Sequence, residues 1–310
     1  MVSLRDAPRP FLPSAGPQQA AVRNLVGVIR LDAATVLLQW AVGGLAFLWF
    51  TTRRREVGVG YGWLLRGTYL LIAAGAAVVG LRFDTVPVRE VASIGVAIAA
   101  LVTLAISVMR RKAGVAGHAD EHDRRSARVA EMTGIERQAA VREGGPEFDP
   151  RLDLLAPALG VVGLVAAGVD AGGNVLVSLL RVFAGAAFLG AITDAMLLGH
   201  WYLVQPGLPR RLLNELVRAV GWVWPFEVLS LLLPTGMVSV WSGDIDDGWS
   251  GQLGWFWGGC AVGTLALVVV TRAALRERYY SAVMAATGLL YLAILTGFGT
   301  DLVARAILAG

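Results

Sequence analysis

Eight long apolar stretches, separated by short polar segments, dominate the pattern of hydrophobic and polar positions along the chain. A helix needs about 20 apolar residues to cross a bilayer core about 30 Å thick. These runs are too long and too continuous for barrel strands, which alternate over about 10 residues. Because every backbone polar group must be paired in lipid, each run has to be a helix. The sequence therefore predicts an all-α, polytopic integral membrane helix bundle of about eight transmembrane helices, near residues 34–51, 61–81, 88–109, 154–170, 174–203, 212–236, 253–271 and 279–300.

Composition agrees with a membrane protein and excludes some chemistry. Of the 310 residues, 56% are hydrophobic and 16% are charged, whereas about a quarter of the residues of a soluble domain are charged. Cys260 is the single cysteine, so the chain forms no internal disulfide and cannot hold an iron–sulfur cluster on cysteines. The basic residues stand at the ends of the apolar runs, which indicates membrane topology and no nucleic-acid partner.

The charged loops predict an orientation. Basic residues follow the first, third, fifth and seventh runs, whereas the loop after the sixth run is acidic. Cytoplasmic loops are enriched in Lys and Arg, so both termini are predicted outside, in a bacterial cytoplasmic (inner) membrane. Arg82 and Arg89, after the second run, disagree with this orientation. The loop residues concerned are Arg53, Arg54, Arg55, Arg110, Arg111, Lys112, Arg210, Arg211, Arg272, Arg276 and Arg278, against Asp244, Asp246 and Asp247.

Four segments follow from this layout. Residues 1–33 form an extramembrane tail, whose part 18–31 is either an interfacial amphipathic helix or an extended start to the first span. Residues 34–109 hold three membrane helices, and residues 152–310 hold five. Between them, residues 110–151 form a charged cytoplasmic loop with a predicted helix over 118–143. Such a loop is a solvated helix or a docking surface, so the expected partners are the lipid bilayer and other membrane or peripheral protein subunits.

Two sequence patterns bear on how the helices pack. Small residues four positions apart let membrane helices approach closely, and they occur in the fourth and seventh runs. A second pattern is a weak echo between Gly190–Asp194 and Gly297–Asp301, in runs of opposite direction, as an inverted repeat requires. Chance is the simpler explanation of the echo. The small-residue pairs are Gly168 with Gly172, Gly254 with Gly258, and Gly259 with Gly263.

Ionisable residues inside the apolar runs are the main candidates for function, because a charge at the bilayer centre costs at least about 2.5 kcal/mol. Glu227 follows Pro225, which should kink the sixth helix, and is predicted to be a protonatable site. The alternative is an internal ion pair of Glu227 with Arg181 or Arg66. Asp170 and Asp301 stand near the predicted outer surface, where solvated carboxylates are expected.

The end of the fifth run carries a second group of candidates. Thr193, Met196 and His200 share one helical face, with Asp194 on a neighbouring face. Trp201 and Tyr202 are typical of an aromatic belt, which places His200 near the cytoplasmic interface. His200 is then a proton carrier or quinone ligand, a haem or metal ligand together with Met196, or an interfacial hydrogen-bonded histidine.

His118 and His122 lie four residues apart in the charged loop. This spacing puts both rings on one face of a helix, where they can bind a transition metal. The flanking pattern of a zinc protease is missing, so a solvated loop is the simpler interpretation. Because both histidines lie in the loop, a haem bound by two histidines of this chain is disfavoured. Quinone remains the candidate cofactor.

Three functions compete at this point. The favoured one is a membrane subunit of a respiratory or other electron-transfer assembly that handles quinone or protons through Glu227, His200, Asp194, Arg181 and Arg66. In topology alone, eight spans with both ends outside resemble the polysulfide-reductase-type quinol-handling anchors. The others are a proton-coupled secondary transporter of a small solute and a scaffold or assembly factor without chemistry. No motif of a known enzyme reaction is present to separate them.

Overall fold

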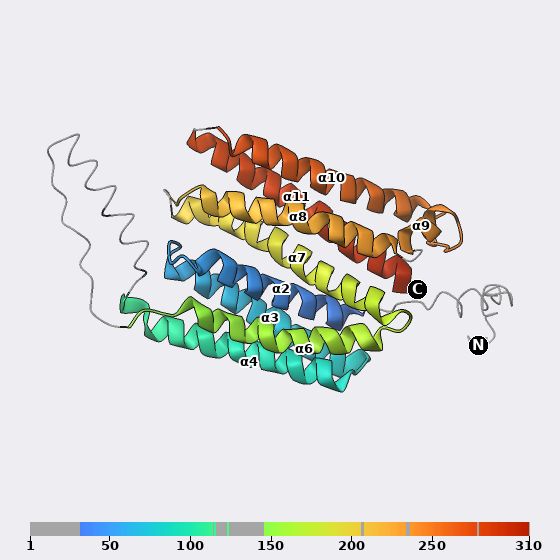
Figure 1. The fold of residues 1–310 in the computed structure, drawn as a ribbon, viewed down its shortest axis with the longest axis horizontal. Helices are drawn as coiled ribbons and strands as arrows, with labels where there is room; N and C mark the ends of the chain where they lie inside the picture. The colour runs from blue at the N-terminus through green and yellow to red at the C-terminus, as the bar shows by residue number, and fades with distance from the viewer. Residues whose placement is uncertain are drawn as a thin grey trace, which may run out of the picture.

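The computed structural model describes residues 32–113, 115, 123, 146–205, 208–233, 236–277 and 279–309, and these residues contain helices and no strand. The predicted helices over 18–31 and 118–143 lie outside the described residues, apart from position 123. Eight long helices run side by side (Figure 1). They are α2 (Ala33–Thr52), α3 (Val59–Phe83), α4 (Pro87–Met109), α6 (Leu155–Asp170), α7 (Val175–Val204), α8 (Arg211–Leu232), α10 (Gln252–Ala274) and α11 (Tyr280–Ala309).

Among the described helices, seven are long and apolar enough to cross a membrane, with α6 extended at its start by the short helix η2 (Pro150–Leu154). The prediction of an all-α membrane bundle is thus confirmed. The eighth long helix, α8, lies in the same bundle and has a similar length, but it carries four charged residues. Three of them, Arg211, Glu215 and Arg218, stand in its first two turns. Further short helices are η1 (Arg111–Ala113) and α9 (Gly236–Trp241).

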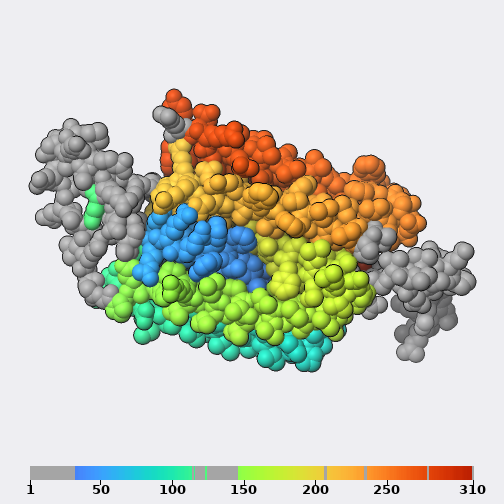
Figure 2. Space-filling model, in the orientation of Figure 1, coloured from blue at the N-terminus to red at the C-terminus, as the bar shows by residue number. Residues whose placement is uncertain are grey.

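The helices group into two rings of four. In the first ring, α2 packs on α3, α3 on α4, α4 on α6, and α6 again on α2. In the second ring, α7 packs on α8, α8 on α10, α10 on α11, and α11 again on α7. The main contact between the rings is that of α2 with α7, in the middle of the bundle (Figures 1 and 2). The long polar loop divides the chain into three helices and five, but α6 completes the first ring.

The two ends of the bundle differ in charge. The basic end, at which α2, α4, α7 and α10 finish, carries the arginine clusters; the acidic end, at which α3, α6 and α8 finish, carries the aspartates of the α9–α10 loop (Figure 1). Arg89, at the acidic end, is buried and donates to Glu90, Asp32 and Thr35. Its charge is neutralised within the protein, and the predicted orientation stays a prediction.

Glycines at the crossing of α2 and α7 let the two rings approach closely. A Cβ atom on Gly43 would lie 1.7 Å from the carbonyl oxygen of Ala186, and one on Gly190 would lie 2.2 Å from the carbonyl carbon of Gly43. Only hydrogen fits at both positions, so the helix backbones are in direct contact. Of the predicted pairs in α10, Gly254 and Gly258 face Trp241, whereas a Cβ on Gly259 would have no atom within 4 Å.

Candidate functional site

Glu227 is completely buried in α8, two residues after Pro225. Within the described part of the chain, no N–H or O–H group donates to either of its carboxyl oxygens, and the carboxyl group lies within hydrogen-bond reach of that of Asp301. Its electrostatic neighbours are Asp301 and Arg305 of α11 and Arg181 of α7. Because an ionised carboxylate buried without partners is costly, the proton content of Glu227 depends strongly on these neighbours.

Asp301 and Arg305 form a buried ion pair one turn apart on α11. The Nε and Nη2 atoms of Arg305 each lie 2.7 Å from Oδ1 of Asp301. Oδ2 of Asp301 and Nη1 of Arg305 are buried and have no partner among the described residues. Gly185 on α7 makes room for the guanidinium group, because a Cβ there would lie 2.2 Å from Nη2.

The prediction that Asp301 is a solvated carboxylate near the surface is wrong. Its side chain is fully buried, because α9 and the start of α10 cover this end of α11. Trp257 of α10 donates to the carbonyl oxygen of Thr300 at 2.9 Å and packs with Met237 of α9 and Ile307 of α11 in a small apolar cluster. Asp170, by contrast, is exposed at the end of α6.

Arg181 joins α7 to the end of α8. Its Nε atom donates to the carbonyl oxygen of Ser230 at 2.8 Å, and Nη2 donates to the carbonyl oxygen of Leu233. The last carbonyl groups of a helix have no partner within the helix, and a cation is favoured there by the helix dipole. Arg181 therefore caps α8 while it stands close to Glu227, and its hydrogen bonds go to the backbone.

Arg66, the other arginine considered for Glu227, lies at the opposite end of the bundle. Its Nε and Nη2 atoms donate to the two carboxyl oxygens of Asp153 at 2.7 and 2.6 Å, and Phe148 stacks 4.3 Å from the guanidinium carbon. Both charged groups are buried. The proposed pairing of Arg66 with Glu227 is thus wrong, because η2 of the first ring supplies a carboxylate to Arg66.

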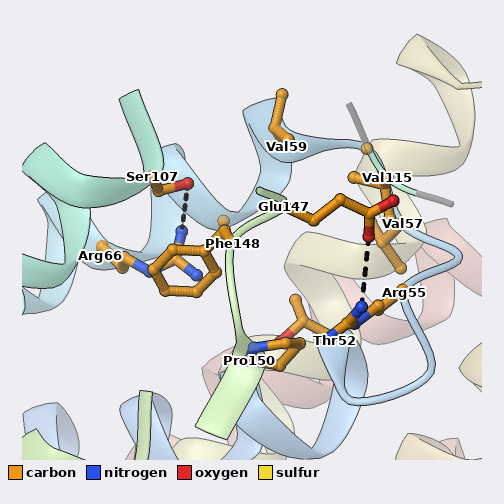
Figure 3. Close-up of a pocket in the computed structure, with 12 residues that line it drawn as sticks. Thr52, Arg55, Val57, Val59, Arg66, Ser107, Val115, Glu147, Phe148 and Pro150 are labelled. Atoms are coloured by element: carbon orange, nitrogen blue, oxygen red, sulfur yellow. Dashed lines mark hydrogen bonds and ion pairs between the residues drawn. The ribbon is translucent and has the colours of Figure 1, made fainter. Parts of the chain in front are cut away.

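A pocket opens beside Arg66 at the basic end (Figure 3). It has a volume of about 400 Å³, open solvent included, and its wall contains Arg66, Ser107 and Phe148. At its mouth Arg55 lies 3.3 Å from a carboxyl oxygen of Glu147. Each cation of the wall is thus matched by a carboxylate, which makes the pocket a poor site for an anion.

His200 is exposed on the surface of α7, and its Nδ1 atom lies 3.0 Å from the hydroxyl oxygen of Tyr291 on α11. Met196 is half-buried one turn earlier on the same helix. Axial haem ligands approach the iron from opposite faces of the ring, so these two side chains cannot hold one haem between them. Tyr202 is buried and donates to the carbonyl oxygen of Pro209 at 2.8 Å, so its assignment to an aromatic belt is wrong.

Asp194 is fully buried and belongs to a different part of the bundle from Glu227. Tyr69 of α3 donates its hydroxyl proton to Oδ1, whereas Oδ2 has no partner among the described residues. Asp194 stands thirteen residues after Arg181 on α7, which corresponds to about 20 Å along the helix. The sequence candidates therefore divide into two separate groups.

The predicted metal ligands His118 and His122 lie outside the described residues. Within the residues that the structure does describe, no three His, Cys, Asp or Glu side chains are grouped so that they could hold a metal ion. Compared with known proteins, the chain matches no protein-family model, no curated protein and no solved structure. The buried groups themselves are therefore the remaining indication of function.

Sequence reasoning missed Arg305, Asp153 and Tyr69 as partners of the intramembrane charges. One signal was available, because Asp301 and Arg305 are four residues apart, the spacing at which an acid and a base meet on one helix. Nothing comparable exists for Asp153 and Tyr69. Their partners are 87 and 125 residues away in the chain and meet them only in the folded bundle.

Proposed function

We propose that the protein handles protons inside the membrane, as a membrane subunit of a respiratory or other electron-transfer assembly. The observation that carries the proposal is the buried carboxyl group of Glu227, which receives no hydrogen bond from an N–H or O–H group of the described residues and lies within hydrogen-bond reach of Asp301, the acid of the Asp301–Arg305 pair. Intramembrane acidic groups with this placement are typical of proton relays.

The charges around Glu227 support a group that alternates between two protonation states. With Glu227 ionised, two carboxylates are balanced by the guanidinium groups of Arg181 and Arg305. With Glu227 protonated, one positive charge remains, and the carbonyl end of α8 at Ser230 and Leu233 partly offsets it. Two carboxyl groups in close proximity also favour the binding of one proton between them. The ionised state of the cluster is therefore neutral, and the protonated state keeps one positive charge that the helix end partly offsets.

The electron-transfer part of the proposal concerns His200 and Tyr291. Both side chains are exposed on the bundle surface, where a lipid-dissolved quinone can reach them. An imidazole and a phenol are hydrogen-bond donors suited to quinone carbonyl oxygens. A quinol oxidised there releases two protons and passes its two electrons to a redox subunit of the assembly. The charged loop 110–151 is the segment proposed to dock such a subunit.

The test begins with extraction of the native complex in mild detergent, identification of the co-purifying subunits by mass spectrometry, and extraction of quinone. Proton release on oxidation of added quinol is then compared between the wild type and Glu227→Gln. Glu277→Gln, at an exposed position of the α10–α11 loop, is the matched control. We expect redox subunits, bound quinone, and proton release that is lost only in Glu227→Gln. Normal proton release in that variant contradicts the site, and a complex without redox subunits contradicts the electron-transfer assignment.

Proton-coupled transport of a small solute is the second candidate, and the arrangement of four helices plus four favours it. Because successive helices alternate in direction, α2 and α7 run the same way, as the first helices of two parallel repeats would. Asp194 and Asp301 are both buried with one carboxyl oxygen that no described group donates to. Their shared Thr-Asp echo lies within the second ring and does not relate the two repeats. Proton-driven uptake in proteoliposomes tests this candidate. If neutralising the buried acids lowers only expression, the scaffold interpretation replaces both.

A further inference from the structure

Asp194 and Tyr69 form a hydrogen-bonded pair at the junction of the two helix rings. Asp194 belongs to α7 of the second ring and Tyr69 to α3 of the first ring. Both side chains are completely buried, and the phenol donates to Oδ1 of the carboxyl group. Oδ2 is also buried, and the described residues offer it no partner. This oxygen is a free acceptor position in the membrane interior.

The surrounding helices are shaped to hold this pair. Gly44 of α2 lets the ring of Tyr69 lie directly on the helix backbone, because a Cβ there would lie 1.9 Å from Cζ of Tyr69. One residue before Asp194, the hydroxyl of Thr193 accepts from the indole Nε1 of Trp40 at 3.0 Å. Side chains of the first ring therefore fix both Thr193 and Asp194, which limits the conformations open to the carboxyl group.

Few titratable groups act on Asp194. From α3, Tyr69 does so by its hydrogen bond and Tyr61 does so electrostatically. From α2, the neighbouring polar group is the indole of Trp40, which does not titrate. Glu227, Asp301 and Arg305 of α8 and α11 gather around Arg181, about 20 Å away along α7. His200, about 9 Å further along α7, and its partner Tyr291 of α11 are exposed on the bundle surface. Asp170 of α6 is exposed at the acidic end. The protonation of Asp194 is thus separate from that of Glu227.

Polar groups extend from this pair toward the basic end. Tyr61 is buried two turns earlier on α3. Its hydroxyl lies within reach of Thr51, near the end of α2, although no hydrogen bond of good geometry joins it to another described residue. Beyond Thr51, in the α2–α3 loop, Glu56 pairs with Arg211 and keeps its Oε2 atom buried. Tyr61 and Tyr69 are about 12 Å apart along α3, a separation that water molecules have to bridge for proton transfer.

We propose that Asp194 is a second proton-binding site, which exchanges protons with the basic end of the bundle through Tyr61. This inference deepens the proposed proton-handling function and rests on it. The proton arrives on water and binds Oδ2, the carboxylate becomes a neutral carboxyl group, and the phenol of Tyr69 keeps its own proton. The reverse step returns the proton to water. Since a hydrogen bond to a charged acceptor is stronger than one to a neutral acceptor, protonation weakens a link between the rings.

The test is infrared difference spectroscopy of the full-length protein in liposomes, which records the C=O band of a protonated carboxyl group during a pH step. We expect one band to disappear in Asp194→Asn and a separate band to disappear in Glu227→Gln. Tyr69→Phe should retain the Asp194 band and shift its frequency, because it removes the hydrogen bond to Oδ1. This variant also keeps the test decisive if Asp194→Asn does not fold.

Access through Tyr61 is tested by the rate at which the Asp194 band shifts after transfer to deuterated buffer. Tyr61→Phe should slow this exchange by about a hundredfold, the lower range of what a positioned proton-transfer group contributes. Its free energy of unfolding should fall by no more than about 1 kcal/mol, because the hydroxyl makes no hydrogen bond of good geometry and loses only its interaction with Thr51. Tyr279→Phe, at an exposed tyrosine, is the control.

The two proposals fail in different ways. Loss of the Glu227 band alone, with no band assigned to Asp194, overturns this inference and leaves the proposed function standing. If a band that titrates is assigned to Asp194 and none is assigned to Glu227, the proposed function at Glu227 is overturned, and the inference that Asp194 binds a proton remains. Exchange in Tyr61→Phe as fast as in Tyr279→Phe overturns the route through Tyr61.

Discussion

Arg66 of α3 and Asp153 of η2 form a bidentate ion pair, with N–O distances of 2.7 and 2.6 Å. Both charged groups are buried. The pair joins η2, at the start of the fourth span, to α3 near the basic end of the first ring. Removing one partner leaves the other as a buried, unpaired charge, whereas removing both leaves none. The pair is therefore expected to behave as a unit when it is mutated.

We predict that Arg66→Met and Asp153→Asn each lower the free energy of unfolding by about 3–5 kcal/mol. The double variant should be clearly more stable than the sum of the two losses implies. Thermal or denaturant unfolding in detergent, followed by tryptophan fluorescence, gives the four values of the double-mutant cycle. Additive losses would show that the two groups do not act on each other.

Close packing of the two rings predicts that Gly43→Ala is destabilising. Alanine alone raises the stability of a helix interior by about 1 kcal/mol relative to glycine. At position 43, however, its Cβ meets the carbonyl oxygen of Ala186 at 1.7 Å, and such overpacking costs about 1–3 kcal/mol. The measurement is the unfolding midpoint in detergent. Gly259→Ala is the control, because a Cβ there meets no atom within 4 Å, and its unfolding midpoint should not be lower than that of the wild type. Equal midpoints for the two variants would contradict the close crossing of α2 and α7.

Asp247 anchors the start of α10, outside the membrane-spanning segment. Partial burial acts to raise the pKa of its carboxyl group, but backbone N–H groups of Gly251, Trp249 and Leu253 donate to it and bring the pKa below its usual value. A lowered pKa means that its contribution to stability is complete at neutral pH and is lost as the pH falls through the pKa of the folded state.

We therefore expect Asp247→Ala to lower the unfolding midpoint at pH 7 and to remove part of the decline that the wild type shows below about pH 4. Asp170→Asn, at an exposed aspartate of the same end, should leave both the midpoint and its pH dependence unchanged. Unfolding midpoints measured over a pH series provide the comparison. If the unfolding midpoints of Asp247→Ala and the wild type decline in parallel as the pH falls, the hydrogen bonds to Asp247 do not stabilise the protein.

His200 is predicted to matter for a ligand more than for the fold. Its ring is exposed and contacts Tyr291, whereas the contact between α7 and α11 is also held by Thr287, whose hydroxyl donates to the carbonyl oxygen of Gly199 at 3.0 Å. His200→Ala should change the free energy of unfolding by no more than about 0.5 kcal/mol and should lower the quinone content. A large loss of stability with normal quinone content would make His200 a structural link.

Several features could be predicted from local sequence because they depend on local chemistry. An apolar run of sufficient length becomes a helix in lipid whatever its neighbours are, which is why seven predicted spans are found and α8, with its charged first turns, is the exception. Glu227 and Asp194 stand out in the sequence for the same reason, since a charge inside an apolar run is costly wherever it packs.

The partners of these groups could not be predicted in this way. A membrane helix is apolar on all sides, so it has no stripe that shows which face turns inward. The sequence therefore places Asp301 at the surface, although it is buried. It also allows an ion pair of Arg66 with Glu227, although the partner of Arg66 is Asp153, at the other end of the bundle. Those assignments depend on the rotation of each helix and on which helices are neighbours.

The sequence by itself determined that the chain is a helical membrane protein, where its seven apolar spans lie, and which few ionisable residues enter the apolar interior. Only the tertiary structure decided that the helices form two rings of four, that Asp301 and Arg305 meet Glu227, and that Tyr69 meets Asp194. The physical reason is that helix formation in lipid follows from local hydrophobicity, whereas pairing follows from close contacts such as that of Gly43 with Gly190, which join distant parts of the chain.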